Sequence, residues 1–247
     1  MGSSSSGEAL ETSELGSDRT VSTSRVDTNP ASKEGSLSFP PRYAAEARPR
    51  RTRRSAAETQ KQIIGVAVDQ IAAVGFNKMS IAEVAAASGI SQSGLLHHFP
   101  SKVALLAAIL EQREEDDNAF LFGDGTVPLG WDAFEALVSV SARNSTRPEW
   151  VGVFVRVAAE ATEADHPAHA WLRAHYTSAQ RWLGDALEHG KRVGVVRKDA
   201  PTELLVGNTV AVLDGIQQRW LVDEQIDMVG CVREYVAGLR RSWEVAP

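Results

Sequence analysis

The segment from Ser80 to Lys102 constrains this chain more than any other, because its small and turn-forming residues stand at fixed intervals. Counted from position 81, alanine is fifth (Ala85), glycine is ninth (Gly89) and leucine is fifteenth (Leu95). Alanine lets a second helix cross close over the first, and glycine accepts the positive φ that ends a helix and turns the chain. The leucine is expected to face a small core between the two helices. The spacing predicts a helix-turn-helix, the element that places its second helix in the major groove of DNA.

A longer helix is predicted just before this segment, over residues 55–74. Its apolar side chains recur at helical intervals, at Ile63, Ile64, Ala67, Ile71 and Val74. Gly75 is expected to end this helix, with Phe76 packed beneath it. Serines that can accept hydrogen bonds from free backbone N–H groups precede the next three predicted helices, at Ser80, Ser91 and Ser101.

In this region the chain resembles the TetR family of one-component transcriptional regulators. The resemblance covers about fifty residues and rests on Ile63-Ile64, Gly75-Phe76, Ser80-Ile81, the run from Ser91 to Phe99, and Ser101-Lys102. The chain departs from the family where Ser93 and Gly94 replace the usual glycine and then threonine or alanine. Leu96 also stands where a tyrosine commonly reaches a phosphate. The resemblance therefore implies the fold, whereas a phosphate contact at position 96 is not expected.

Charge and composition divide the 247 residues into three parts. Residues 1–47 are rich in Ser, Thr, Gly and acidic residues and lack apolar periodicity, which predicts a disordered polar tail. Residues 48–102 carry eight Lys/Arg against three Asp/Glu, and residues 103–247 carry fourteen against twenty-two. A basic DNA-binding domain on an acidic body is expected to meet DNA through one end only. No apolar run approaches the length of a membrane span, and a single cysteine, Cys231, fits a reducing cytoplasm.

The expected DNA contacts fall into three groups. Arginines ahead of the first helix are expected to follow phosphates or enter a minor groove, although a solvated flank is the alternative. Gln92 stands near the start of the second helix, where side chains meet base edges, and its amide can pair with adenine. Positions at helix N-termini favour phosphate. The candidate DNA-binding residues are Arg50, Arg51, Arg53, Arg54, Ser80, Ser91, Gln92, Ser93, Gly94, His97, His98, Ser101 and Lys102.

From residue 103 onward the pattern predicts helices only, near 102–120, 131–145, 149–163, 168–190, 201–222 and 226–244. The whole chain is thus expected to be all-α, with about nine helices. The last two helices carry apolar stripes that favour packing against a copy of the same pair, unless both stripes are the core of a monomer. The resemblance implies the same homodimer, a four-helix bundle within a ligand-binding and dimerisation domain. The candidate interface residues are Val206, Val210, Leu213, Gln217, Trp220, Val232, Val236, Leu239 and Trp243.

The middle helices carry many aromatic residues and a few polar ones, which suits a pocket for an apolar small molecule. Aromatic residues at helical spacing are usually core, so it is the resemblance that implies a pocket. The candidate ligand-binding residues are Trp131, Phe134, Trp150, Phe154, Val157, Trp171, His175, Tyr176 and Trp182. His166 and His169 invite a metal site, but zinc needs three or four ligands of fixed geometry, and helix-cap and surface roles are favoured. No metal and no cofactor is expected.

These observations predict a cytoplasmic, homodimeric transcriptional regulator, bound to the nucleoid when it holds DNA. In this family such a protein is most often a repressor, released from a pseudo-palindromic operator by a small apolar effector. A sequence-nonspecific architectural DNA binder and a metal-dependent hydrolase are the alternatives. The sequence has no HExxH, GxSxG or glycine-rich phosphate-loop motif, so an enzyme is not expected.

Overall fold

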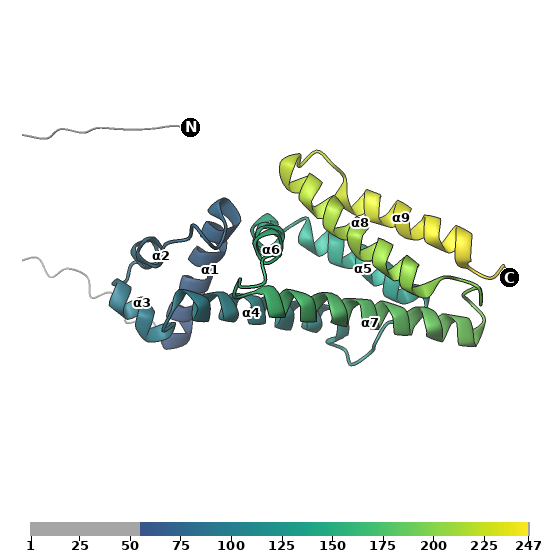
Figure 1. Ribbon diagram of the computed structural model, residues 1–247, viewed down its shortest axis with the longest axis horizontal. Helices are drawn as coiled ribbons and strands as arrows, with labels where there is room; N and C mark the ends of the chain where they lie inside the picture. The colour runs from purple at the N-terminus through teal and green to yellow at the C-terminus, as the bar shows by residue number, and fades with distance from the viewer. Residues whose placement is uncertain (1–54, 247) are drawn as a thin grey trace, which may run out of the picture. The chain divides into compact units, whose positions relative to one another are not determined.

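The computed structural model describes residues 55–246, and within them the chain forms nine α-helices and no β-strand (Figure 1). The predicted polar tail, residues 1–47, lies outside the described residues. The all-α fold is confirmed for residues 55–246. The helices are α1 (Ala56–Val74), α2 (Ile81–Ala87), α3 (Gln92–His98), α4 (Lys102–Phe122), α5 (Trp131–Asn144), α6 (Pro148–Glu160), α7 (His169–Val193), α8 (Thr202–Val222) and α9 (Met228–Trp243).

Helix α1 starts at a capping box and ends at the predicted glycine. The Ser55 hydroxyl accepts from the Glu58 N–H (3.1 Å), and the Glu58 carboxylate accepts from the Ser55 N–H (2.8 Å). Gly75 has a φ of 86°, a conformation that L side chains rarely adopt. Val74, predicted to lie on the apolar stripe, is instead 46% exposed, whereas Ile71 in the same turn is fully buried.

Helices α2 and α3 form the predicted helix-turn-helix. Ser80, Ser91 and Ser101 each accept a hydrogen bond from the backbone three residues later, which confirms them as the caps of α2, α3 and α4. Gly89 has a φ of 69° between the two short helices, as the turn requires. Leu95 is fully buried on the inner side of α3, as expected.

The core beneath the helix-turn-helix is shared with a helix that is distant in sequence. Val153, Phe154 and Val157 of α6 belong to the same buried cluster as the inner residues of α1, α2, α3 and α4. Gly152 makes this contact close, since a Cβ at that position would lie 3.0 Å from the Ala72 Cβ on α1. Helices α1 and α6 are therefore packed at short range.

A second core lies among α5, α7, α8 and α9, and α8 and α9 run side by side at its edge (Figure 1). Helix α7 continues to Val193, beyond its predicted end near 190. Gly190 does not break the helix but gives room to the returning chain, since a Cβ there would lie 2.5 Å from Val196 Cγ2. Gly194, with a φ of 82°, ends the helix instead.

No single helix between residues 55 and 246 has both the length and the apolar composition of a membrane span. Helices α3 and α4 reach that level only when taken together, and they are bent by 53°.

Candidate functional site

The outer side of α3 carries the candidate base-reading side chains. Gln92, Ser93 and His97 are exposed, and His98 is half-buried. The inner side of the same short helix is occupied by Leu95. The polar face of α3 is therefore exposed and can contact a partner.

The three cap serines keep hydrogen atoms that they can donate to a phosphate. Ser91 Oγ accepts from the Gly94 N–H (3.1 Å) and lies 3.0 Å from Ser93 Oγ. Ser80 and Ser101 accept from backbone N–H groups at 3.4 and 3.0 Å. An accepting hydroxyl still has its own proton, so capping and phosphate binding are compatible.

Lys102 has a partner inside the protein. Its ammonium donates to the Asn77 carbonyl (3.0 Å) and lies 4.7 Å from the centre of the Phe76 ring. Burial lowers the pKa of Lys102, while the nearby Glu160 carboxylate raises it. Lys102 thus fastens the start of α4 to the turn between α1 and α2. The other predicted basic contacts, Arg50, Arg51, Arg53 and Arg54, lie outside the described residues.

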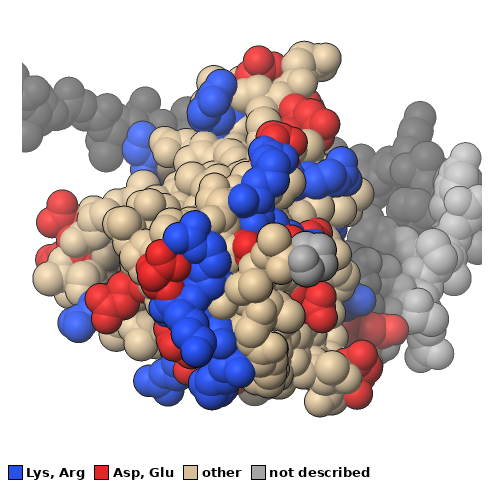
Figure 2. All heavy atoms as spheres, turned by 90° about the vertical axis from the view of Figure 1, so that its right-hand side faces the viewer, with Lys and Arg blue, Asp and Glu red and all other residues tan. Residues whose placement is uncertain are grey.

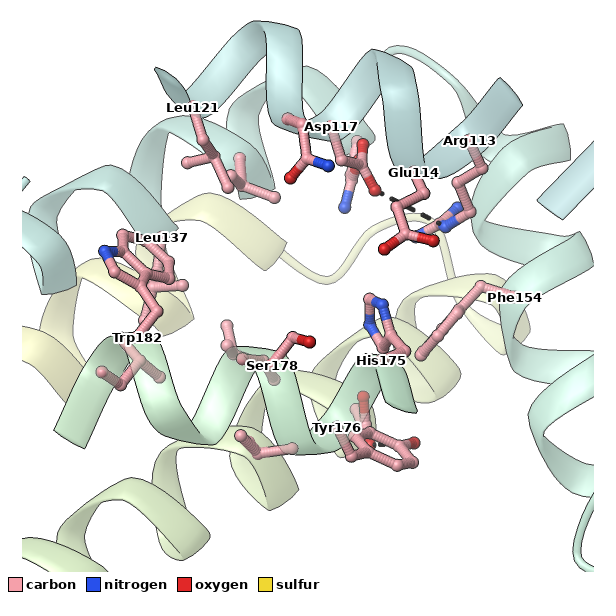
Figure 3. Close-up of a pocket in the computed structure, with 18 of the residues that line it drawn as sticks. Arg113, Glu114, Asp117, Leu121, Leu137, Phe154, His175, Tyr176, Ser178 and Trp182 are labelled. Atoms are coloured by element: carbon pink, nitrogen blue, oxygen red, sulfur yellow. Dashed lines mark hydrogen bonds and ion pairs between the residues drawn. The ribbon is translucent and has the colours of Figure 1, made fainter. Parts of the chain in front are cut away.

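A cavity of about 220 Å³ lies between α4 and α7, and parts of α5, α6 and α8 complete its wall (Figure 3). Its two ends differ in chemistry. Leu121, Leu137 and Trp182 gather at one end, whereas Arg113 and His175 lie at the other, with Glu114 and Tyr176 beside them (Figure 3). The cavity can therefore hold a molecule with an apolar body and a polar end.

Only part of the predicted ligand-binding set borders this cavity. Five of the nine residues line it: Phe154, Trp171, His175, Tyr176 and Trp182. The other four lie elsewhere: Trp131 and Phe134 in the core between α5 and α7, Val157 in the core beneath α1, and Trp150 against the Arg147 guanidinium.

The sequence reading missed the polar wall formed by α4 and α8. Arg113, Glu114 and Asp117 come from α4, and Asp214 and Gln217 come from α8. The sequence does contain a signal for this wall. Arg113 continues the apolar series Leu106, Ile109 and Leu110 on the inner face of α4. A charged residue in line with a buried stripe indicates a polar site within the core.

Tyr176 and Asp214 form a hydrogen-bonded pair at the polar end. The Tyr176 hydroxyl donates to Asp214 Oδ2 at 2.7 Å. Burial raises the pKa of Tyr176, and the bond to Asp214 raises it further, so the hydroxyl keeps its proton. Burial also raises the pKa of Asp214, although the Tyr176 bond and the Arg113 charge oppose that rise.

On the α4 wall of the cavity, three partners hold Arg113. Its Nη1 donates to the Trp150 carbonyl (2.8 Å), its Nε lies 3.7 Å from Asp117 Oδ2, and its guanidinium lies 4.8 Å from the centre of the Phe154 ring. Burial lowers the pKa of Arg113, but the guanidinium stays charged in proteins. Asp117 also accepts from Arg143 Nη1 (2.5 Å), so its charge serves two cations.

His175 contributes a neutral aromatic ring to the cavity wall and no positive charge. Its ring stacks on Trp171, with centroids 5.2 Å apart at 18°, and lies 5.3 Å from Phe154. Burial lowers the pKa of His175, and the Arg113 charge lowers it further. Since free histidine titrates near pH 6.5, the ring is neutral at neutral pH.

Comparison with known proteins assigns this architecture. A family model described as bacterial regulatory proteins, tetR family, matches residues 63–109. An HTH-type transcriptional repressor of Mycobacterium tuberculosis is 24% identical over 187 residues, which span 75% of this chain and 95% of that protein. The HTH-type transcriptional regulator TtgR of Pseudomonas putida is 24% identical over 198 residues, 76% of this chain and 92% of TtgR.

The helix-turn-helix segment of the chain matches the TetR family.

The solved structures that resemble this chain agree on the fold. SmeT is the repressor of the multidrug efflux pump SmeDEF of Stenotrophomonas maltophilia. Its complex with triclosan matches at a TM-score of 0.65 and 16% identity, covering 76% of this chain and 92% of SmeT. These matches confirm the resemblance inferred from the residues: the chain is similar to helix-turn-helix transcriptional regulators of the TetR family.

The apolar stripes expected at a TetR-type dimer interface face inward in this chain. Val206, Val232 and Val236 are buried in the core with α5 and α7, and Trp220 is buried against α6. The remaining residues are partly buried: Val210, Leu213, Leu239 and Trp243 pack on the same core as Val206, and Gln217 lines the cavity. All nine side chains therefore contact other helices of the same chain.

His166 and His169, the two histidines that could suggest a metal site, have partners within the protein. His166 Nδ1 accepts from the Ala168 N–H (3.1 Å), and its ring meets the Phe76 ring edge-on, 5.4 Å away. His169 Nδ1 donates to the Ala161 carbonyl (2.8 Å). Within residues 55–246, no group of three or more His, Cys, Asp or Glu side chains could hold a metal ion.

Basic side chains also gather at the end of the molecule where the chain's last helix ends, as Figure 2 shows. Acidic residues lie among them in the same view. Several of these cations are matched in ion pairs: Lys191–Glu188, Arg197–Asp199, Arg240–Glu135, Arg240–Glu244 and Arg241–Glu234. Much of the positive charge at this end is therefore engaged in ion pairs within the protein.

Proposed function

We propose that this TetR-family protein is a homodimeric repressor that leaves a pseudo-palindromic operator when a small molecule fills the cavity between α4 and α7. The observation that carries the proposal is the double contact of α6. Phe154 of this helix borders the cavity, and Gly152, Arg156 and Glu160 of the same helix touch α1 and the turn after it. A ligand that displaces α6 would move the DNA-reading helices.

The DNA contacts would come from α3 and from the arginine arm. Gln92 and Ser93 would read base edges in the major groove, since they are exposed at the start of α3. The cap serines would donate to phosphates at helix N-termini. Lys102 donates one hydrogen bond to the Asn77 carbonyl and would offer its remaining ammonium donors to a phosphate. Such a regulator would act on chromosomal DNA in the cytoplasm.

The second copy would meet the outer face of α8, opposite the buried stripes. Leu204, Asn208, Ala211, Gly215, Gln218 and Val222 follow one another at steps of three and four residues, and all are exposed. Leu204 is 61% and Val222 86% exposed, which leaves two large apolar side chains in water. The small residues between them would let two helices approach closely. A dimer would place the two α3 helices in successive major grooves, about 34 Å apart.

The effector would act by changing the population of two dimer forms. A coupling of about 1–3 kcal/mol between effector and operator is the ordinary size of such an effect. Helix α4 offers a second route, since it begins beside α1 at Lys102 and lines the cavity from Arg113 to Phe122. Helices α4 and α6 would therefore move as one unit against α7.

The test is selection of bound duplexes from a random pool at about 150 mM salt, near physiological ionic strength, followed by sequencing. Enrichment of an inverted repeat is the expected result. Binding without enrichment would favour the sequence-nonspecific architectural alternative, and absence of binding would contradict a repressor. The Gln92→Ala variant should change the preferred base at one position of each half-site. Arg51→Ala should weaken binding to all sequences and lower the salt slope by about 0.9.

The dimer has its own test. Ala211→Glu should place a charge at the centre of the α8 face and give a monomer in light scattering, with operator affinity lost. Ala107→Glu, an exposed alanine of α4, adds the same charge away from that face and should leave the dimer intact. A dimer that survives Ala211→Glu would move the interface elsewhere.

A further inference from the structure

We propose that the cavity selects an amphipathic organic cation. A protonated amine would lie against Asp214 at the polar end, and an apolar body would extend along Leu121, Leu137 and Trp182. The inference rests on the proposed function only in treating this molecule as the effector. The preference for a cation follows from the charges, acceptors and rings of the cavity wall.

The charged residues of the wall do not balance one another. Arg113 is matched by Asp117, whose carboxylate lies 3.7 Å from the guanidinium and also accepts from Arg143. Glu114 and Asp214 form no ion pair with any residue that the structure describes. Each accepts a hydrogen bond from a neutral donor: Trp171 Nε1 donates to Glu114 at 3.3 Å, and Tyr176 donates to Asp214 at 2.7 Å. Two carboxylates therefore remain for a cationic partner (Figure 3).

Helix α8 supplies a second acceptor beside Asp214. Gln217 follows Asp214 by three residues, so the two side chains lie on one face of the helix, and both line the cavity. Gln217 Oε1 is buried and has no hydrogen-bond partner among residues 55–246. A buried acceptor without a donor raises the free energy of the empty site. An ammonium group carries three donors and can satisfy Asp214 and Gln217 at once.

The aromatic residues around the polar end favour the same charge. Trp171, His175, Tyr176 and Phe154 form a continuous set of ring contacts with centroids between 5.2 and 6.4 Å apart. Ring faces attract organic cations, and the interaction strengthens where water is excluded. His175 does not repel a cation, because its lowered pKa keeps the ring neutral.

An anionic molecule fits this wall poorly. Arg113 is the one cation that lines the cavity in the described chain, and it already faces Asp117, the Trp150 carbonyl and the Phe154 ring. A carboxylate ligand would have to displace Asp117 from Arg113. It would also approach the carboxylates of Glu114 and Asp214, whose like charge repels it.

The test compares three probes with one body and three heads: 4-phenylbutylamine, 4-phenylbutan-1-ol and 4-phenylbutyrate. Their dissociation constants for the full chain are measured by titration calorimetry at neutral pH. The amine should bind about tenfold more tightly than the alcohol, and the acid should bind most weakly. Asp214→Asn should remove the advantage of the amine and change the alcohol by less than about twofold. The amide keeps an acceptor for Tyr176, so the variant should fold.

Asp185→Asn is the matched control. Asp185 lies on α7, is exposed and does not line the cavity, so this variant loses the same charge and should keep the preference for the amine. Tightest binding of the acid, equal binding of amine and alcohol, or an unchanged preference in Asp214→Asn would overturn the proposal. Failure of all three probes to bind up to their solubility limits would overturn it as well.

Operator binding of the same proteins separates this inference from the proposed function. If the amine binds as expected but leaves the operator complex intact, the cavity chemistry stands and the effector role fails. If duplex selection yields no inverted repeat, the repressor proposal fails whatever the order of the probes. If the amine both binds and releases the operator, and Asp214→Asn abolishes both effects, the cavity and the repressor are linked.

Discussion

Helix α6 is packed tightly against α1 on one side and borders a cavity on another. A Cβ added to Gly152 would lie 3.0 Å from Ala72, whereas Phe154, two residues later, faces the space between α4 and α7. Close-packed interiors transmit a displacement, while a cavity lets its walls change their spacing at lower cost. The difference indicates where the protein can deform and where the deformation is passed on.

Polar contacts reinforce the tight side. Arg156 Nε donates to the Ala72 carbonyl (2.5 Å), near the end of α1. Glu160 Oε2 accepts from the Asn77 N–H (3.0 Å) in the turn that leads to α2. Gly152, Arg156 and Glu160 are spaced by four residues and form one edge of α6. This edge joins α6 to the DNA-reading end at three successive turns.

Enlarging Gly152 should have the largest effect, because it separates α6 from α1. Gly152→Leu is expected to lower the free energy of unfolding by about 1–3 kcal/mol, the usual cost of overpacking, despite the better helix propensity of leucine. Operator affinity should fall with it. Urea unfolding and a DNA titration measure the two effects.

Ser178→Leu applies the same enlargement to the loose side. Ser178 is exposed and lines the cavity, so its new side chain can enter empty space. Stability should change by less than about 0.5 kcal/mol, as for most substitutions away from packed contacts. Operator binding should persist while probe binding is lost. Equal destabilisation by the two variants would contradict the difference between the two sides of α6.

Neutralising Glu160 tests the polar part of the tight side. Glu160→Gln weakens the acceptor for the Asn77 N–H and removes the charge that faces Lys102. We expect a loss of about 1–2 kcal/mol in unfolding free energy, typical of a hydrogen bond to a charged group. Glu163→Gln, an exposed neighbour, should lose almost nothing. If both variants unfold alike, Glu160 does not hold the turn.

The starts of the reading helices could be predicted from sequence because a helix cap is a local interaction. Ser80, Ser91 and Ser101 each bond to an N–H three residues away, so no distant part of the chain decides their role. Gly75 and Gly89 follow the same logic, since positive φ is a property of one residue. Local interactions therefore determine where the helices of the helix-turn-helix begin and end, whatever packs against them.

The direction of a helix face could not be predicted in the same way. Val206 and Val236 read equally well as partner contacts or as internal core, and the structure buries them within one chain. Trp131 and Phe134 likewise fit a pocket by residue type but lie in the core. Which face is exposed depends on how α5 and α7 pack against α8 and α9. The spacing of residues along one helix does not determine that packing.

A small effect is also expected from the half-buried carboxyl of Asp214, on the cavity side of α6. Burial holds the pKa of Asp214 above its ordinary range, so the folded protein favours the protonated carboxyl. That contribution to stability is present below the pKa of the unfolded chain, near 3.9, and is lost as pH rises through the folded pKa. Asp214→Asn removes this dependence.

The variant should therefore be more stable than the wild type at pH 7, by on the order of 1 kcal/mol or less, since the side chain is only half-buried. The two proteins should converge when unfolding is measured below about pH 3, where the carboxyl is mostly protonated in both states. A gap that stays constant with pH would mean that the substitution acts through packing. If the stability difference between variant and wild type disappears on acidification, the cavity wall carries a carboxylate charge that no partner compensates.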